Sequence, residues 1–165
     1  GNDYTGFLYA GLMIDSSGTP NVIEYNCRFG DPETQPIMMR MKSNLVQLCE
    51  LALAGKLDTA SAEWDARAAV GVVLAAGGYP AKYGKGFEIS GLAEADSDDS
   101  KVFHAGTTEL NGVTVTSGGR VLCATALGDT VSQAQQKAYT QARKINWKDC
   151  FYRTDIAYRA IARES

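Results

Sequence analysis

An apolar strand runs into a charged loop within the segment Val22-Ile-Glu-Tyr-Asn-Cys-Arg-Phe-Gly-Asp-Pro-Glu-Thr-Gln35. Glu24 and Asn26 stand two residues apart at the end of that strand, so their side chains point to the same face. A carboxylate beside a neutral amide oxygen suits Mg²⁺, which takes few protein ligands and keeps positions for phosphate oxygens. Arg28 has the same parity, and its guanidinium would bind a phosphate or carboxylate if the chain stays extended. The spacing predicts a row of residues for metal, nucleotide and substrate, although a solvated strand end explains the same pattern.

The residues on either side of this segment predict a hairpin and a helix. Residues 6–14 form an uninterrupted apolar run, which is typical of a buried strand. Turn-forming residues separate this run from a second strand at 21–25, which completes a hairpin. Glycine and proline break residues 26–36 into a loop, and Ser43 is expected to cap a helix that ends near residue 55.

Beyond residue 67 the pattern predicts a second domain built from strands and helices. Strands are expected at 68–76, 101–105 and 120–127, with a hairpin at 107–116 around Asn111-Gly112. Thr130 is expected to cap an amphipathic helix, and a short helix follows at 154–162. Antiparallel strands followed by helices indicate an α+β fold, with domain limits at 1–67 and 68–165.

The composition excludes several classes of protein. The chain has 165 residues, of which 45% are hydrophobic, which is enough to bury a core and too apolar for a disordered chain. Its 16 Lys and Arg residues against 19 Asp and Glu residues give a net charge of −3, which argues against a nucleic-acid partner. No apolar run has the length of a membrane span, and the first residues do not resemble a signal peptide. We therefore expect neither a nucleic acid nor a membrane among the partners.

The cysteines and the single histidine do not indicate a zinc site. The four cysteines are widely spaced without a CxxC pair, and His104 is the only histidine. We therefore expect free thiols in a reducing, cytoplasmic environment. His104 lies in an apolar strand, where a buried structural role is expected rather than acid–base catalysis. The acidic residues at 96–99 lack the spacing of a calcium loop and are expected to be solvated.

Four stretches of the chain resemble the motifs of one enzyme family. They are Asn26-Cys-Arg-Phe-Gly-Asp-Pro-Glu-Thr-Gln35, Gly71-Val-Val-Leu-Ala-Ala-Gly-Gly-Tyr-Pro80, Val102-Phe-His-Ala-Gly-Thr107 and Ser117-Gly-Gly-Arg-Val-Leu122. The first resembles the signature of glycinamide ribonucleotide synthetases, also called phosphoribosylamine–glycine ligases. The others resemble successive motifs of the C-terminal domain in that family, in the same order, and the segment before the signature is similar to the closing hairpin of the family's ATP-grasp domain. The resemblance implies that residues 1–67 are the C-terminal part of an ATP-grasp domain and residues 68–165 the C-terminal domain.

The resemblance also implies an activity and a set of site residues. Members of the family use ATP to join glycine to 5-phosphoribosylamine through a glycyl phosphate, giving glycinamide ribonucleotide, ADP and phosphate in purine biosynthesis. Glu24 and Asn26 match the metal ligands of the family, with Mg²⁺ or Mn²⁺ as the ion. By charge, Arg28 is the candidate for neutralising the transferred phosphoryl or the substrate carboxylate, and Asp31 would hold an amine. Gly30 would shape the loop.

The family's polypeptide is more than twice as long as this chain. We therefore expect a C-terminal fragment that is inactive alone and is completed by the N-terminal portion of its own protein. Two alternatives stay open: another ATP-grasp ligase that joins a carboxylate to an amine, and a non-catalytic binding or assembly module. Residues 28–33 discriminate against the carboxylase relatives, which share the E-x-N pattern but should lack this loop.

Overall fold

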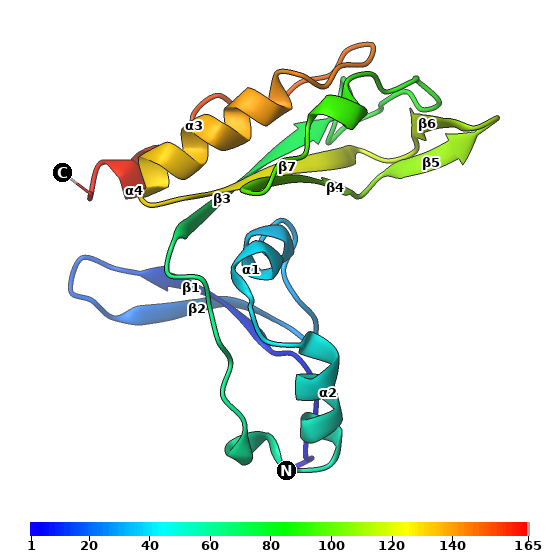
Figure 1. The fold of residues 1–165 in the computed structure, drawn as a ribbon. Coiled ribbons are helices and arrows are strands. Elements are labelled where there is room, and N and C mark those ends of the chain that lie inside the picture. Colours follow the sequence, from blue (N-terminus) through cyan, green and yellow to red (C-terminus); the bar gives the residue numbers. More distant parts are fainter. Residues whose placement is uncertain (165) are drawn as a thin grey trace. The chain divides into compact units, whose positions relative to one another are not determined.

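The computed structural model describes residues 1–164, which divide into two compact units (Figure 1). The N-terminal unit contains residues Gly1–Thr34 and Met41–Trp64. The C-terminal unit contains Gln35–Arg40 and the chain from Asp65 onward. Both units combine helices with small antiparallel sheets, which confirms the α+β class.

In the N-terminal unit, strands β1 (Tyr9–Ile14) and β2 (Pro20–Asn26) form an antiparallel hairpin. The turn is held by Asp15, whose carboxylate accepts hydrogen bonds from the backbone N–H groups of Ser17 (2.9 Å) and Thr19 (3.0 Å). The register shifts by one residue between Gly11 and Leu12, which is the signature of a β-bulge.

The prediction of a buried strand at residues 6–14 is wrong. The apolar side chains of the hairpin are exposed, with 59% exposure for Met13 and 64% for Ile23. The physical reason is that a hairpin buries its apolar residues only against a third strand or a covering layer. Within the described residues of the N-terminal unit, no further strand extends this sheet.

Two helices begin at positions that the sequence pattern did not indicate. Helix α1 (Thr34–Arg40) starts inside the predicted loop. Pro36 does not prevent this helix, because it lies in the first turn, where the missing N–H of proline costs little. Helix α2 (Leu45–Leu53) is capped by Asn44 instead of Ser43. The Asn44 Oδ1 atom accepts hydrogen bonds from the N–H groups of the first helical turn at 3.0 and 3.3 Å. Ser43 instead accepts a hydrogen bond from the Glu63 N–H at 2.7 Å.

The C-terminal unit is organised around a three-stranded antiparallel sheet in the order β3-β7-β4. These strands are β3 (Ala68–Ala75), β7 (Arg120–Gly128) and β4 (Ser100–His104). Helix α3 (Val131–Ala142) lies along this sheet (Figure 1) and packs against β3 and β7. Because β7 is central and covered, every residue from Val121 to Gly128 is buried, as its continuous apolar sequence requires.

Several local predictions for this unit are confirmed. Thr130 caps α3 by accepting a hydrogen bond from the Gln133 N–H at 3.1 Å. Strands β5 (Thr107–Leu110) and β6 (Val113–Thr116) form the expected hairpin around Asn111-Gly112, where both turn residues have positive φ. Helix α4 (Tyr158–Ile161) is shorter than predicted.

His104 is exposed, so the prediction of a buried histidine is wrong. It occupies the last position of β4, which is an edge strand of the three-stranded sheet, and an edge position is open to solvent on one side. Its Nδ1 atom lies 3.0 Å from the Thr107 hydroxyl.

The acidic loop at 96–99 is solvent-exposed at Asp96 and Asp98, as predicted, and it is also tied to the rest of the unit. Asp99 forms ion pairs with Arg67 at 2.6 Å and with Lys137 at 2.7 Å. Asp96 accepts a hydrogen bond from the Val102 N–H at 2.7 Å. These contacts connect the start of β3, the loop and α3.

Leu74→Ala is expected to destabilise the C-terminal unit by about 2–5 kcal/mol, because truncation of this buried side chain (0% exposed) leaves a cavity. Leu110→Ala makes the same change on an exposed strand (55% exposed) and should cost less than about 0.5 kcal/mol. Urea unfolding followed by circular dichroism gives both values. Equal losses in the two variants would contradict the assignment of the core to the three-stranded sheet.

Asp99→Asn is expected to remove a contribution to stability that depends on pH. Lys137, and then Arg67, hold the pKa of Asp99 below its usual range, so its ionised carboxylate stabilises the folded state above a pH of about 4. That contribution is lost as the pH falls through the lowered pKa. The stability difference between wild type and variant, measured by urea unfolding, should therefore be larger near neutral pH than in strong acid. A difference that is independent of pH would argue against the ion pairs, and Asp98→Asn controls for the lost negative charge.

Candidate functional site

The predicted metal pair lies at the end of β2. In the hairpin register, Glu24 is opposite Gly11 and Asn26 is opposite Tyr9. The bulge precedes Glu24, so the alternation from Glu24 to Asn26 is regular and both side chains lie on one face. Within residues 1–164, neither side chain forms a hydrogen bond or an ion pair, and Glu24 is exposed. Two side-chain oxygen-bearing groups thus lie on the same side of the strand.

Gly11 makes room for the Glu24 side chain. A Cβ atom at Gly11 would lie 3.2 Å from the Cγ atom of Glu24, which is tighter than an ordinary packing contact. The absence of a side chain at this position lets Glu24 lie across the neighbouring strand.

The structure does not extend the row of site residues to Arg28. Strand β2 ends at Asn26 and the chain bends at residues 27–28, so the strand parity that was assumed for Arg28 is lost. The exposed Arg28 side chain turns back, and its Nη1 atom donates a hydrogen bond to the Phe29 carbonyl at 2.9 Å. Asp31 is also exposed and lies farther along the same loop.

Tyr9 and Glu33 belong to this face and were not predicted. The Tyr9 hydroxyl donates a hydrogen bond to the Glu33 Oε1 atom at 3.1 Å. This hydrogen bond, the charge of Glu33 and, to a smaller extent, the charge of Glu24 raise the pKa of the Tyr9 phenol. A correct prediction of the hairpin register would have shown that Tyr9 lies opposite Asn26. No local sequence signal indicates the contact of Tyr9 with Glu33, which is 24 residues away.

Aromatic residues make a second set of contacts with this loop. The rings of Phe7 and Phe29 pack with their centroids 4.2 Å apart. The Tyr4 hydroxyl donates to the Phe7 carbonyl at 2.8 Å and lies 3.3 Å from the Cys27 carbonyl. In the loop between Asn26 and α1, Phe29 is therefore partly buried, while Arg28 and Asp31 are exposed.

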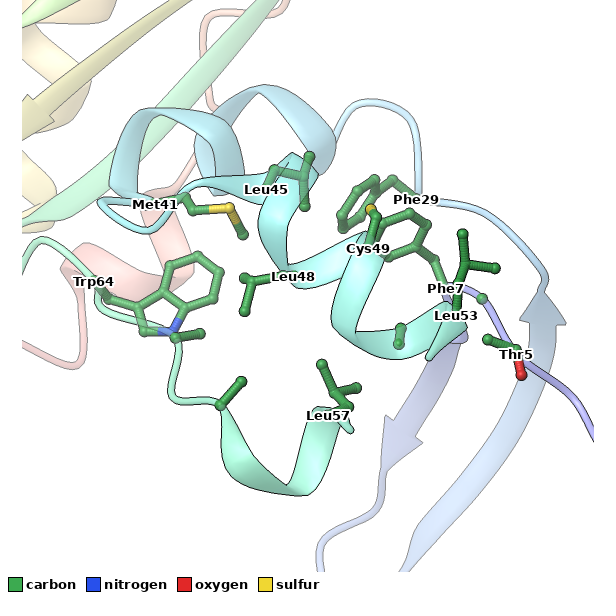
Figure 2. A pocket seen from close by; sticks show the side chains of 14 residues that line it. Thr5, Phe7, Phe29, Met41, Leu45, Leu48, Cys49, Leu53, Leu57 and Trp64 are labelled. Atoms are coloured by element: carbon green, nitrogen blue, oxygen red, sulfur yellow. The ribbon is translucent and has the colours of Figure 1, made fainter. Parts of the chain in front are cut away.

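Phe29 reaches an open apolar pocket of about 550 Å³ in the N-terminal unit. Figure 2 shows Phe7 and Phe29 together at one end of this pocket and Trp64 at the other, with leucine side chains of α2 between them. Its lining is almost entirely apolar and includes none of the four predicted site residues, Glu24, Asn26, Arg28 and Asp31. The pocket is therefore unsuited to phosphates or carboxylates.

The described part of the chain offers few other sites for a metal. His, Cys, Asp and Glu side chains between residues 1 and 164 do not gather in groups of three or more that would hold an ion. None of the four cysteines, all of which lie in the described residues, forms a disulfide bond. None of the helices in the described residues has the length and apolar character needed to span a bilayer.

Comparison with known proteins connects both parts of the chain to one family. Residues 69–159 match the C domain of phosphoribosylglycinamide synthetase, and residues 1–34 match the ATP-grasp (A) domain of the same enzyme. The chain is 70% identical to phosphoribosylamine–glycine ligase of Pseudomonas aeruginosa and 66% identical to that of Vibrio vulnificus. Each alignment covers 99% of this chain and 38% of the relative, so the chain spans little more than a third of the length of these relatives.

A solved structure supports the same relationship. The crystal structure of phosphoribosylamine–glycine ligase from Thermotoga maritima superimposes with a TM-score of 0.76 at 38% identity. The match covers 90% of this chain and 36% of that chain. The order of the motifs, the match to both domains and the shared fold agree, and the chain belongs to the phosphoribosylglycinamide synthetase family.

Proposed function

We propose that the protein containing this chain is an ATP-dependent ligase that joins glycine to 5-phosphoribosylamine. The observation that carries this proposal is the identity of 62–70%, along nearly the whole chain, to proteins named phosphoribosylamine–glycine ligase. In this assignment, residues 1–67 are the C-terminal part of the ATP-grasp domain, and residues 68–165 are the C-terminal domain. The products are glycinamide ribonucleotide, ADP and phosphate.

The residues at the end of β2 fit a hard divalent cation. Glu24 and Asn26 offer one charged and one neutral oxygen on the same strand face, and neither is engaged elsewhere in residues 1–164. This donor set suits Mg²⁺ or Mn²⁺ with most positions left for other oxygens. When bound, the ion would neutralise negative charge on the phosphate oxygens of ATP.

Asn26, Arg28 and Asp31 would each contribute to binding the substrates. Asn26 contributes an oxygen without a second negative charge, which limits repulsion of the triphosphate. Arg28 would leave the Phe29 carbonyl to bind the transferred phosphoryl or the glycine carboxylate, and Asp31 would bind an amine. The glycine carboxylate takes the phosphoryl group of ATP, and the amine of the sugar then displaces phosphate from the glycyl phosphate.

The rest of the longer protein supplies what this chain does not contain. The chain corresponds to 38% of its curated relatives, so most of the nucleotide site would come from the preceding portion of the protein. The partners in this proposal are therefore ATP, glycine, 5-phosphoribosylamine and that N-terminal portion. The chain alone would not turn over.

Glu24→Gln in the full-length protein is expected to lower ligase activity by at least about 100-fold, because loss of a direct metal ligand should exceed the effect of outer-shell changes. The measurement is ADP release in the presence of Mg²⁺, glycine and 5-phosphoribosylamine, with each substrate omitted in turn. The variant should also need more Mg²⁺ for half-maximal activity. Glu109→Gln makes the same change at an exposed position of β5 and should retain wild-type activity.

Each other outcome of this assay points to a different conclusion. ADP release with another acid or amine would favour a different ATP-grasp ligase. No release from a folded full-length protein would favour a binding or assembly module. Release that depends on both substrates from the 165-residue chain alone would refute the need for the N-terminal portion.

A further inference from the structure

We infer that the hydrogen bond between Tyr9 and Glu33 positions the loop of residues 27–33 against the strand face that carries Glu24 and Asn26. Tyr9 and Glu33 are thus positioning residues for the reaction, and this inference rests on the proposed ligase function. The contact joins β1 to the end of the loop, and neither side chain is proposed to bind the metal or the substrates.

The strand register places Tyr9 on this face, at the end of the hairpin. Tyr9 is the cross-strand partner of Asn26, and the side chains of such partners lie on the same side of a sheet. From there its hydroxyl reaches the Glu33 Oε1 atom at 3.1 Å, at the end of the loop where α1 begins. The bond therefore joins the metal-binding strand face to the far end of the loop.

The side chains of Tyr9 and Glu33 pack against the loop backbone at Gly30. A Cβ atom at this buried residue would collide with the Glu33 carboxylate and would lie 3.2 Å from the Cε2 atom of Tyr9. The Gly30 carbonyl accepts hydrogen bonds from the Thr34 N–H at 3.1 Å and from the Thr34 hydroxyl at 2.6 Å. The middle of the loop is thereby held between the tyrosine ring and the first turn of α1.

The two charged residues proposed to act on substrates flank this fixed point. Arg28 lies two residues before Gly30 and Asp31 directly follows it, and both are exposed. If the backbone at Gly30 shifts, both side chains shift with it. Since a displacement of about 1 Å is enough to slow an enzymatic reaction by roughly 100-fold, the Tyr9–Glu33 bond is placed where its loss would reduce the rate.

Tyr9→Phe in the full-length protein tests the inference because it removes only the hydroxyl. We expect kcat to fall by roughly 10- to 100-fold. The KM for ATP and the Mg²⁺ requirement should change by less than about twofold, because Glu24 and Asn26 remain in place. Tyr25→Phe is the matched control, since Tyr25 lies on the same hairpin, opposite Ala10, and is 62% exposed. An unchanged kcat in Tyr9→Phe would overturn the inference.

A double-mutant cycle separates positioning from a direct role of Glu33. Glu33→Gln keeps an oxygen acceptor for Tyr9 and should retain most of the activity, whereas Glu33→Ala should lose as much as Tyr9→Phe. The double variant should lose no more than either single variant, because both remove the same bond. A large loss in Glu33→Gln together with full additivity would show that Glu33 acts directly on the reaction, which would overturn the inference.

Backbone hydrogen exchange gives a test that does not depend on activity. In full-length Tyr9→Phe, amides of residues 27–33 should exchange several-fold faster than in wild type, while those of β7 should not change. Unchanged exchange in the loop would overturn the positioning role. An inactive wild-type enzyme whose loop shows the expected change would instead contradict only the proposed ligase function.

Discussion

Strand β7 is the central constraint of the structure, because it pairs with β3 and β4 along its edges, packs against α3 and buries every residue from Val121 to Gly128. This constraint selects the small residues around it. A Cβ atom at Gly128 would collide with the backbone of Ala134, and one at Gly71 would lie 3.0 Å from the Cys123 sulfur. Because these glycines have no side chain, the helix and the strands approach each other closely and form the core. Val72, Leu74, Val121 and Ala138 are completely buried in it.

The N-terminal unit is held by a different kind of interaction. Its two strands expose most of their apolar residues, so local contacts have to give the polar loop its shape. Phe7 packs on Phe29, while the Tyr9 hydroxyl donates a hydrogen bond to Glu33. The largest core of the chain and the proposed site residues therefore belong to different units, and a variant that weakens the core need not alter the loop.

Features that depend on neighbouring residues were predicted well. The Thr130 cap, the Asn111-Gly112 turn and the common face of Glu24 and Asn26 each follow from rules that act over a few residues. Two of the failures, at the starts of α1 and α2, had local causes too. Pro36 suggested a chain break but fits the first turn of α1, and Ser43 competed with Asn44 for the same cap.

The amino-acid sequence by itself determined the fold class, the family resemblance and the proposed metal pair, because periodicity and motif spacing are properties of short segments. Only the tertiary structure decided which distant groups meet. The contacts of Tyr9 with Glu33, and of Asp99 with Arg67 and Lys137, span 24, 32 and 38 residues. The structure also shows that the chain bends at residues 27–28, which ends the strand parity on which the predicted direction of the Arg28 side chain depended. Contacts between residues so far apart in the sequence depend on how whole elements pack, and the local preferences of the residues involved do not encode them.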